Sequence, residues 1–138
     1  MSANRILVSS ESDFESTVGY SRAVRIGPHI AVAGTTGPVP ATDIGDIGAQ
    51  TREALRRIEV ALHQAGAVLS DVVRTRIYVT DISRWREIAA VHSEVFGDIR
   101  PAATMVEVAA LIAPELLVEI EADAYSPSAR NVPSAAGR

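Results

Sequence analysis

The sequence contains no cysteine and no lysine, and each absence excludes a class of function. Without cysteine the chain can form no disulfide, no thiolate nucleophile and no cysteine-based zinc or iron–sulfur site. Without lysine, its permanent cations are all arginines, which are scattered among carboxylates and form no basic run. Nucleic-acid binders neutralise phosphates with clustered cations, whereas the net charge here is −4. We therefore expect no nucleic-acid partner.

Long apolar runs and aromatic residues are also scarce. No run approaches the ~20 residues that cross a bilayer. The opening MSANRILVSSESDFES is too polar for a secretory signal, whose apolar segment takes ~7–15 residues. We expect no membrane partner and, by default, a cytoplasmic location. Aromatic residues make up only 4% of the chain, so the core has to be built from Val, Ile, Leu and Ala.

The chain of 138 residues is long enough for one domain. We place it at residues 1–125, with a core from about residue 17, and expect a disordered polar tail at 126–138. Apolar runs and alternation predict strands at 23–26 and 30–33, joined by a Gly-Pro turn, and at 72–80, 103–111 and 116–125. Residues 34–48 read as a loop, and residues 1–17 as either a short edge strand or a flexible leader.

Helical spacing of apolar residues predicts two helices. The first runs from an N-cap at Asp46 to Gly66, with an apolar stripe of Leu55, Ile58, Leu62 and Ala65. The second runs from about Ser83 to Phe96, with a stripe of Trp85, Ile88, Ala89, His92, Val95 and Phe96. Together with the strands, they predict an α+β fold in which two helices cover one face of a single sheet.

The other face of this sheet would be polar. In the strand at 72–80, Val73, Thr75, Ile77 and Val79 point one way and Arg74, Arg76 and Tyr78 the other, while the last strand carries Glu119, Glu121 and Asp123. Such a face suits a subunit interface or a lined cleft, so we expect an oligomer. The carboxylates either pair with the arginines across the sheet, the reading we favour, or supply a general acid/base. Periodicity does not separate the two.

Other chemistry finds little support. The three histidines are too scattered for a metal site, and we interpret His92 as packed and hydrogen-bonded and His63 as a helix-end residue. The stretch GTTG has no following lysine, and no nucleophile-elbow motif occurs. We expect neither a metal nor an organic cofactor.

Five segments, however, resemble motifs of the Rid (YjgF/YER057c/UK114) family. They cover about residues 17–125 in the expected order and are Gly19–Val24, Ile30–Gly34, Arg74–Asp81, Arg100–Val108 and Val118–Ala122. The resemblance implies a chorismate-mutase-like α+β fold. It also implies a homotrimer with a small-molecule cleft between neighbouring subunits, and hydrolysis of enamines or 2-imino acids to oxo acids and ammonia.

The resemblance also implies site residues. The family's tyrosine falls on Tyr20, its turn glycine on Gly34, its glutamate on Glu119, and the two positions after its arginine on Thr104 and Met105. The arginine that grips the substrate carboxylate falls on Ala103, which has no donor. Three cations stand as possible replacements, Arg22, Arg76 and Arg100.

Three hypotheses follow. The first is a trimer that binds a small metabolite and hydrolyses an enamine or imine, with Glu119 as acid/base, Tyr20 and Thr104 as polar contacts, and Ala103 and Met105 as an apolar wall. The second is a non-catalytic binding or regulatory protein with the same cleft. The third is a ribonuclease or translation inhibitor, which the acidic charge and the absence of lysine disfavour.

Overall fold

The computed structural model describes residues 4–127, and these form one six-stranded mixed sheet of order β1-β2-β3-β6-β4-β5. The strands are β1 (Arg5–Val8), β2 (Ala23–Ile26), β3 (His29–Thr36), β4 (Val72–Val79), β5 (Ala102–Glu107) and β6 (Val118–Tyr125). The helices are α1 (Asp13–Val18), α2 (Ile47–Gln64) and α3 (Trp85–Phe96). Three short 3₁₀ turns, η1 (Ala41–Asp43), η2 (Leu69–Asp71) and η3 (Ile82–Arg84), lie between them.

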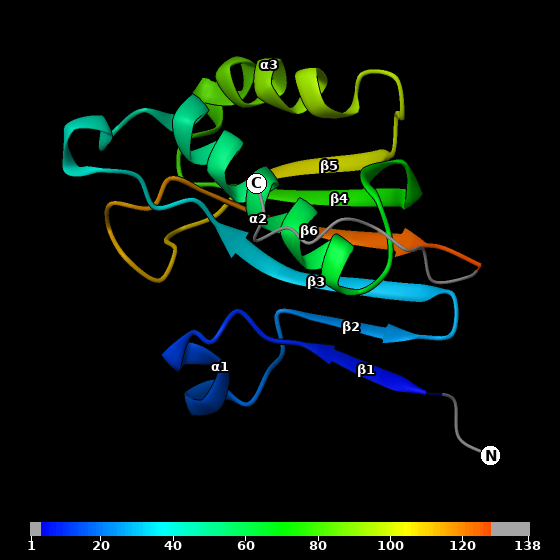
Figure 1. Cartoon of the computed structure of the whole chain (residues 1–138). Coiled ribbons are helices and arrows are strands. Elements are labelled where there is room, and N and C mark those ends of the chain that lie inside the picture. The colour runs from blue at the N-terminus through cyan, green and yellow to red at the C-terminus, as the bar shows by residue number, and fades with distance from the viewer. Residues whose placement is uncertain (1–3, 128–138) are drawn as a thin grey trace.

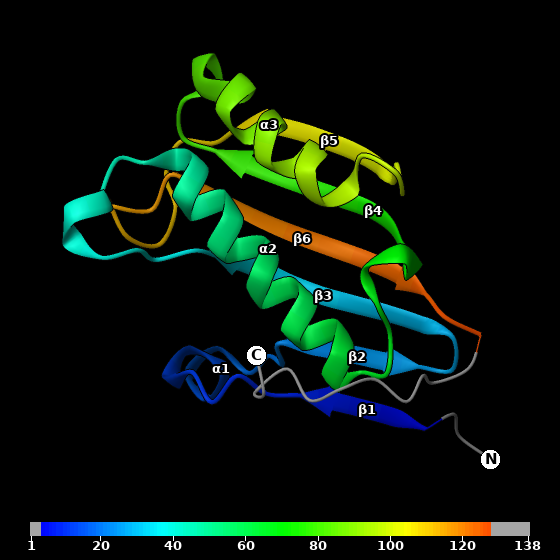
Figure 2. The same cartoon turned by 45° about the horizontal axis from the view of Figure 1, so that its top comes forward.

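Helices α2 and α3 lie on the same face of the sheet, which confirms the predicted α+β architecture (Figures 1 and 2). Within residues 4–127, no helix is long and apolar enough to cross a membrane. The predicted tail falls, from residue 128 on, outside the described residues.

Helix α2 begins and ends as its sequence predicts. The Asp46 side chain accepts a hydrogen bond from the Ala49 backbone amide at 2.9 Å, which satisfies one of the free donors of the first turn. After the helix, Gly66 adopts a φ of +80°, a left-handed conformation that favours glycine. Leu55, Ile58 and Leu62 are all buried against the sheet.

The last described strand, β6, lies in the middle of the sheet. It pairs antiparallel with β3 on one side and with β4 on the other. Its residues Val118, Ile120, Ala122 and Ala124 are buried under the helices, while Glu119, Glu121 and Asp123 lie on the open face, as the alternation predicted. Beyond β4, the edge strand β5 runs parallel to it, and α3 makes the crossover between the two.

Several local predictions were wrong. Val73 is 52% exposed because the β4–β6 ladder shifts register between Val72 and Arg74, which reverses the alternation there. Trp85 is also exposed, whereas Val91 takes a buried place on α3 that the predicted stripe omitted. Strand β3 continues to Thr36, into the predicted loop, and β5 ends at Glu107 rather than at residue 111.

The N-terminal segment is the edge strand of the two alternatives, since β1 pairs antiparallel with β2. It is followed by α1, a six-residue helix that was not predicted because its sequence shows no apolar periodicity. Its two large apolar side chains, Phe14 and Val18, are exposed.

Arg25 ties three elements together from inside the molecule. The residue is only 4% exposed. Its guanidinium donates to the carbonyl oxygens of Gly27 at 2.9 Å, Ala65 at 3.0 Å and Ser126 at 2.7 Å. A buried cation is tolerated when it is well hydrogen-bonded, and the Arg25 guanidinium donates to carbonyls at the β2–β3 turn, the end of α2 and the end of β6.

Candidate functional site

Four predicted site residues meet where β3 lies beside β6; we call them the Glu119 cluster: Tyr20, Arg22, Gly34 and Glu119. The Arg22 guanidinium donates to the Gly34 carbonyl oxygen at 2.8 Å, to the buried Thr35 Oγ1 at 3.0 Å and to the Tyr20 hydroxyl at 3.0 Å. The guanidinium carbon also lies 5.5 Å from the centre of the Tyr20 ring. These contacts fix Arg22 and hold the Gly34 backbone in place.

Gly34 and Glu119 approach each other so closely that a side chain at position 34 would push the Glu119 carboxyl out of its present position. The β3–β6 ladder shifts register between Val32 and Thr35, so Gly34 lies in an irregular part of the strand. A Cβ atom at Gly34 would overlap the Glu119 carboxyl oxygen Oε2. The glycine therefore makes room for the carboxylate, which leaves one face of the Gly34 backbone open to it.

The Glu119 carboxyl is electrostatically unusual. Burial raises its pKa above the ordinary glutamate value, the neighbouring charge of Glu121 raises it further, and Arg22 partly opposes both. A carboxyl that keeps its proton to higher pH is better matched to proton transfer near neutrality. This is the property expected of a general acid/base.

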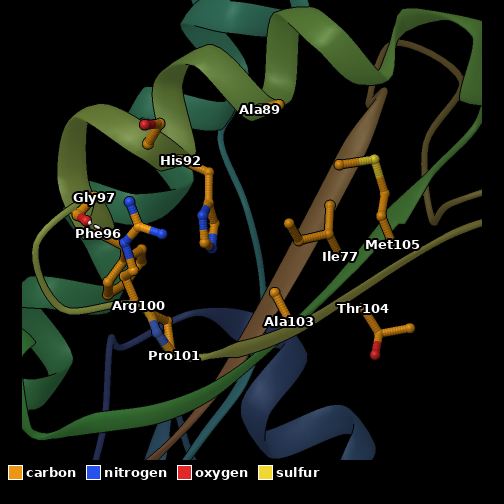
Figure 3. Close-up of a pocket in the computed structure, with 11 residues that line it drawn as sticks. Ile77, Ala89, His92, Phe96, Gly97, Arg100, Pro101, Ala103, Thr104 and Met105 are labelled. Carbon is orange, nitrogen blue, oxygen red and sulfur yellow. Dashed lines mark hydrogen bonds between the residues drawn. The ribbon is translucent and has the colours of Figure 1, made fainter.

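A second group of predicted residues lines a hollow of about 550 Å³ between α3 and β5. We call it the α3–β5 pocket; its lining includes Ile77, His92, Phe96, Arg100, Ala103 and Met105. The side chains of Ala103, Arg100 and His92 point into the space beneath the helix, as Figure 3 shows. The Thr104 side chain points away from it, because Thr104 lies opposite Arg76 and so shares the open face of the sheet.

His92 was predicted as a packed, hydrogen-bonded residue, and this is confirmed. Its Nε2 atom lies 3.0 Å from the hydroxyl of Thr75, which is fully buried on β4. Its ring packs against Phe96 at 4.8 Å between centroids. Burial lowers the pKa of His92, so the imidazole is neutral near pH 7. We did not predict that His92 faces the same pocket as Ala103. The signal in the sequence was its place on the apolar stripe of the second helix, which faces the sheet.

The predicted residues thus form two groups rather than one site. Strands β6 and β4 separate β3 from β5. Gly34, on β3, is therefore two strands away from β5. Glu119, on β6, is one strand away, and its side chain lies on the opposite face of the sheet from Ala103 and Met105. A larger hollow of about 1090 Å³ adjoins the cluster, bordered by Tyr20, Arg22 and Gly34 and by parts of α1 and α2.

Arg76 belongs to neither group, since it lies on the open face among the acidic row of β6. It contacts Asp123 at 2.9 Å and Glu121 at 3.4 Å, while the Tyr78 hydroxyl donates to Glu121 at 3.0 Å. The cross-sheet pairing predicted for the carboxylates is confirmed for Arg76. Arg74 forms no ion pair within the described part of the chain. Among residues 4–127, no group of three or more His, Asp or Glu side chains is arranged to hold a metal.

Comparison with known proteins adds a family. The family model described as Endoribonuclease L-PSP matches residues 10–126. A RutC family protein of Pyrococcus abyssi is 39% identical over 109 residues, which cover 77% of this chain and 85% of that protein. A protein of Acinetobacter baylyi named 3-aminoacrylate deaminase RutC is 38% identical over 82 residues, 59% of this chain and 64% of that protein.

Solved structures agree with these sequence matches. A member of the YjgF/YER057c/UK114 family from Mycobacterium tuberculosis is 71% identical, with a TM-score of 0.84 and coverage of 88% of this chain and 99% of that one. A member of the Rid family from Yersinia pestis is 30% identical, with a TM-score of 0.77 and coverage of 88% and 99%.

Proposed function

Because the chain belongs to the YjgF/YER057c/UK114 (Rid) family, we propose that it is a homotrimer whose inter-subunit clefts bind a small metabolite and hydrolyse an enamine or imine. The half-buried carboxyl of Glu119, set against the bare Gly34 backbone, is the observation that carries this proposal.

The reaction requires a group that can both give and take a proton. Water adds to the C=N carbon, the nitrogen gains protons, and ammonia leaves as the carbonyl forms; an enamine first takes a proton on carbon. A carboxyl whose pKa is raised toward neutrality can deprotonate the attacking water and return that proton to the leaving nitrogen. Tyr20, linked to the cluster through Arg22, adds a hydroxyl that can hold the substrate.

The open face of the sheet supports the trimer. It carries the polar row of Arg76, Tyr78, Glu121 and Asp123, and the strand at its edge, β5, exposes Val106. The two groups of site residues lie at separate parts of the sheet. A neighbouring subunit that covered the open face could place its α3–β5 pocket against the Glu119 cluster and so complete one cleft.

The named activity of one relative fits this chemistry. The Acinetobacter baylyi protein is named for deamination of 3-aminoacrylate, an enamine that carries a carboxylate. Glu119 could supply a proton transfer of the same kind here. In this proposal Thr104, whose side chain lies on the open face, contacts the neighbouring subunit or its ligand.

Ammonia release from an imine generated in situ tests the proposal. We expect turnover by the unaltered protein and a loss of ~10²–10⁴-fold in kcat/KM for Glu119→Gln, the usual contribution of a general acid/base. Glu94→Gln is the matched control, because Glu94 lies on the surface of α3 and pairs with Arg52, at 2.7 Å. Equal activity of the Glu119→Gln and Glu94→Gln proteins would disprove the role of Glu119.

A non-catalytic binding or regulatory protein is the second candidate. It is favoured by Ala103, which puts no charge and no hydrogen-bond donor where the family resemblance implies an arginine. Saturable binding of a metabolite without any release of ammonia, by a protein that sediments as a trimer, would support this candidate over the first.

A further inference from the structure

The α3–β5 pocket is bordered by an exposed cation, Arg100, that makes few hydrogen bonds with the rest of the fold. We infer that Arg100 is the carboxylate anchor of this pocket, and that the pocket takes small carboxylates with a branched apolar body. This deepens the proposed function by naming the substrate class, and it rests on that function only for the hydrolytic step.

Of the three arginines that could replace the one missing at position 103, Arg100 has the fewest partners. Arg22 is held by three hydrogen bonds, two of them within the Glu119 cluster and one to Thr35, and Arg76 is held by two carboxylates on the open face. Arg100 donates from Nε to the Gly97 carbonyl oxygen at 3.1 Å, and its two terminal nitrogens form no bond to any other described residue. The guanidinium edge that binds a carboxylate in two-point fashion is therefore available.

Arg100 is also held where its side chain borders the pocket, in a backbone conformation that arginine rarely adopts. Its φ is +58°, and its amide donates to the Phe96 carbonyl oxygen at 2.8 Å as the chain leaves α3. Glycine or asparagine adopts this conformation at a lower free-energy cost. The backbone at this helix end therefore does not favour arginine. A function of the arginine side chain would explain why it is found there.

The remaining walls specify the rest of the ligand. Ile77, Phe96, Ala103 and Met105 are apolar, so they favour a branched aliphatic body over a small polar one. The small Ala103 side chain leaves space between the anchor and Met105 that an arginine would fill. His92, oriented by Thr75 at 3.0 Å, offers one polar group, suited to the oxo or imino group next to the carboxylate.

Binding can be measured without turnover, by titrating the protein with 4-methyl-2-oxopentanoate in a calorimeter. We expect Arg100→Gly to weaken binding by about tenfold, as the loss of one charge-assisted hydrogen-bonding partner at an exposed arginine would. It should also leave the melting temperature unchanged or raise it, because glycine relieves the left-handed backbone. Arg86→Gln is the control, since Arg86 lies on α3 over the Trp85 ring, at 4.5 Å, and outside the pocket.

Two more ligands define the substrate class. The neutral amide of the same oxo acid should bind weakly and be insensitive to Arg100→Gly, and 2-oxopropanoate should bind more weakly than the branched acid. The His92 ring protons should shift in NMR spectra on titration with the branched acid, and not with the amide.

Each other result overturns the inference. It fails if the unaltered protein does not bind the branched acid, if Arg100→Gly binds it as tightly, or if Arg86→Gln loses as much affinity. Binding that depends on Arg100 without any hydrolysis would contradict the proposed function and leave this inference standing. Hydrolysis at the same rate in the Arg100→Gly protein would support the proposed function and contradict this inference.

Discussion

The Glu119 cluster and the α3–β5 pocket use arginine in opposite ways. In the cluster, Arg22 donates hydrogen bonds to a backbone carbonyl and two hydroxyls, so it holds Gly34 and Tyr20 in place. In the pocket, the Arg100 guanidinium makes one hydrogen bond among the described residues, to the Gly97 carbonyl oxygen at the end of α3. Arg25, buried and hydrogen-bonded to four carbonyl oxygens, is the extreme case of the first kind.

The difference shows that the number of internal acceptors indicates what an arginine does. This matters in a protein without lysine, where arginine supplies every permanent side-chain cation and composition does not separate structural from binding roles. A guanidinium has five donors. Where the fold provides acceptors for most of them, the residue is structural. Where it does not, the free donors face solvent, and a pocket beside them, as at Arg100, makes them available to a ligand.

The largest expected effect is on stability, at Arg25. We expect Arg25→Met to lower the free energy of unfolding by about 3 kcal/mol, because buried carbonyls would lose their charged partner. Arg100→Met, measured by the same urea denaturation, should change it by less than about 0.5 kcal/mol. Similar losses for the two variants would remove the distinction between structural and ligand-facing arginines.

A smaller effect, on activity, is expected at Gly34. Gly34→Ala should lower the imine hydrolysis rate by about 100-fold, because the new Cβ would push the Glu119 carboxyl away from the position in which it meets the substrate. A shift of about 1 Å in a reacting group is enough for a loss of this order. Gly48→Ala makes the same chemical change in α2, where the nearest atom to a Cβ is the Asp46 Oδ1 at 3.4 Å. It should leave the rate unchanged. An active Gly34→Ala protein would show that Glu119 need not occupy its present position.

In the α3–β5 pocket, the corresponding test uses pH. Burial lowers the pKa of His92 in the folded state, so below pH 6.5 the unfolded chain binds more protons and stability falls as the pH falls. The urea midpoint should therefore decrease between pH 7 and pH 5, and less so in His92→Gln. An unchanged slope would mean that His92 is as solvated in the folded protein as in the unfolded chain.

The smallest effect is expected on the pH profile of Glu119. The charge of Glu121 is one cause of the raised Glu119 pKa, so Glu121→Gln should move the acid limb of kcat/KM toward lower pH. The maximal rate should change little, because Glu121 contacts Arg76 and Tyr78 rather than Gly34. A limb that moves toward higher pH, or does not move, would contradict this electrostatic account.

The sequence predicts best those features that local chemistry determines. The cap at Asp46, the left-handed Gly66 and the alternation along β6 were all predictable, because each depends on residues within one element. The edge strand β1 was left open as an alternative, since its apolar run of three residues is short. Val73 was misplaced because the register shift on β4 is set by pairing with β6, far away in sequence.

The same contrast between local and long-range features applies to the candidate site. Family resemblance pointed to Tyr20, Gly34, Glu119, Ala103 and Met105. Only the topology shows that they fall into two groups, with Gly34 and Glu119 on the paired strands β3 and β6, and Ala103 and Met105 on the edge strand β5. His92 and Ala103 share a pocket because β5 pairs in parallel with β4 beneath α3, and no local pattern encodes that pairing. The same holds for the arginines, whose roles depend on acceptors that the fold brings to them.

The central position of β6 has a consequence for the order in which the protein is made. Strands β1 to β3 can pair as their residues leave the ribosome, and β4 can pair with β5, but these two halves share no ladder until β6 enters between them. Residues 118–125 are synthesised after every other strand, so closure of the sheet waits for nearly the whole described chain. Glu119 lies on that strand. During synthesis, the acid/base candidate and the continuous sheet therefore arrive in the same step, and a nascent chain that stops before Val118 has neither.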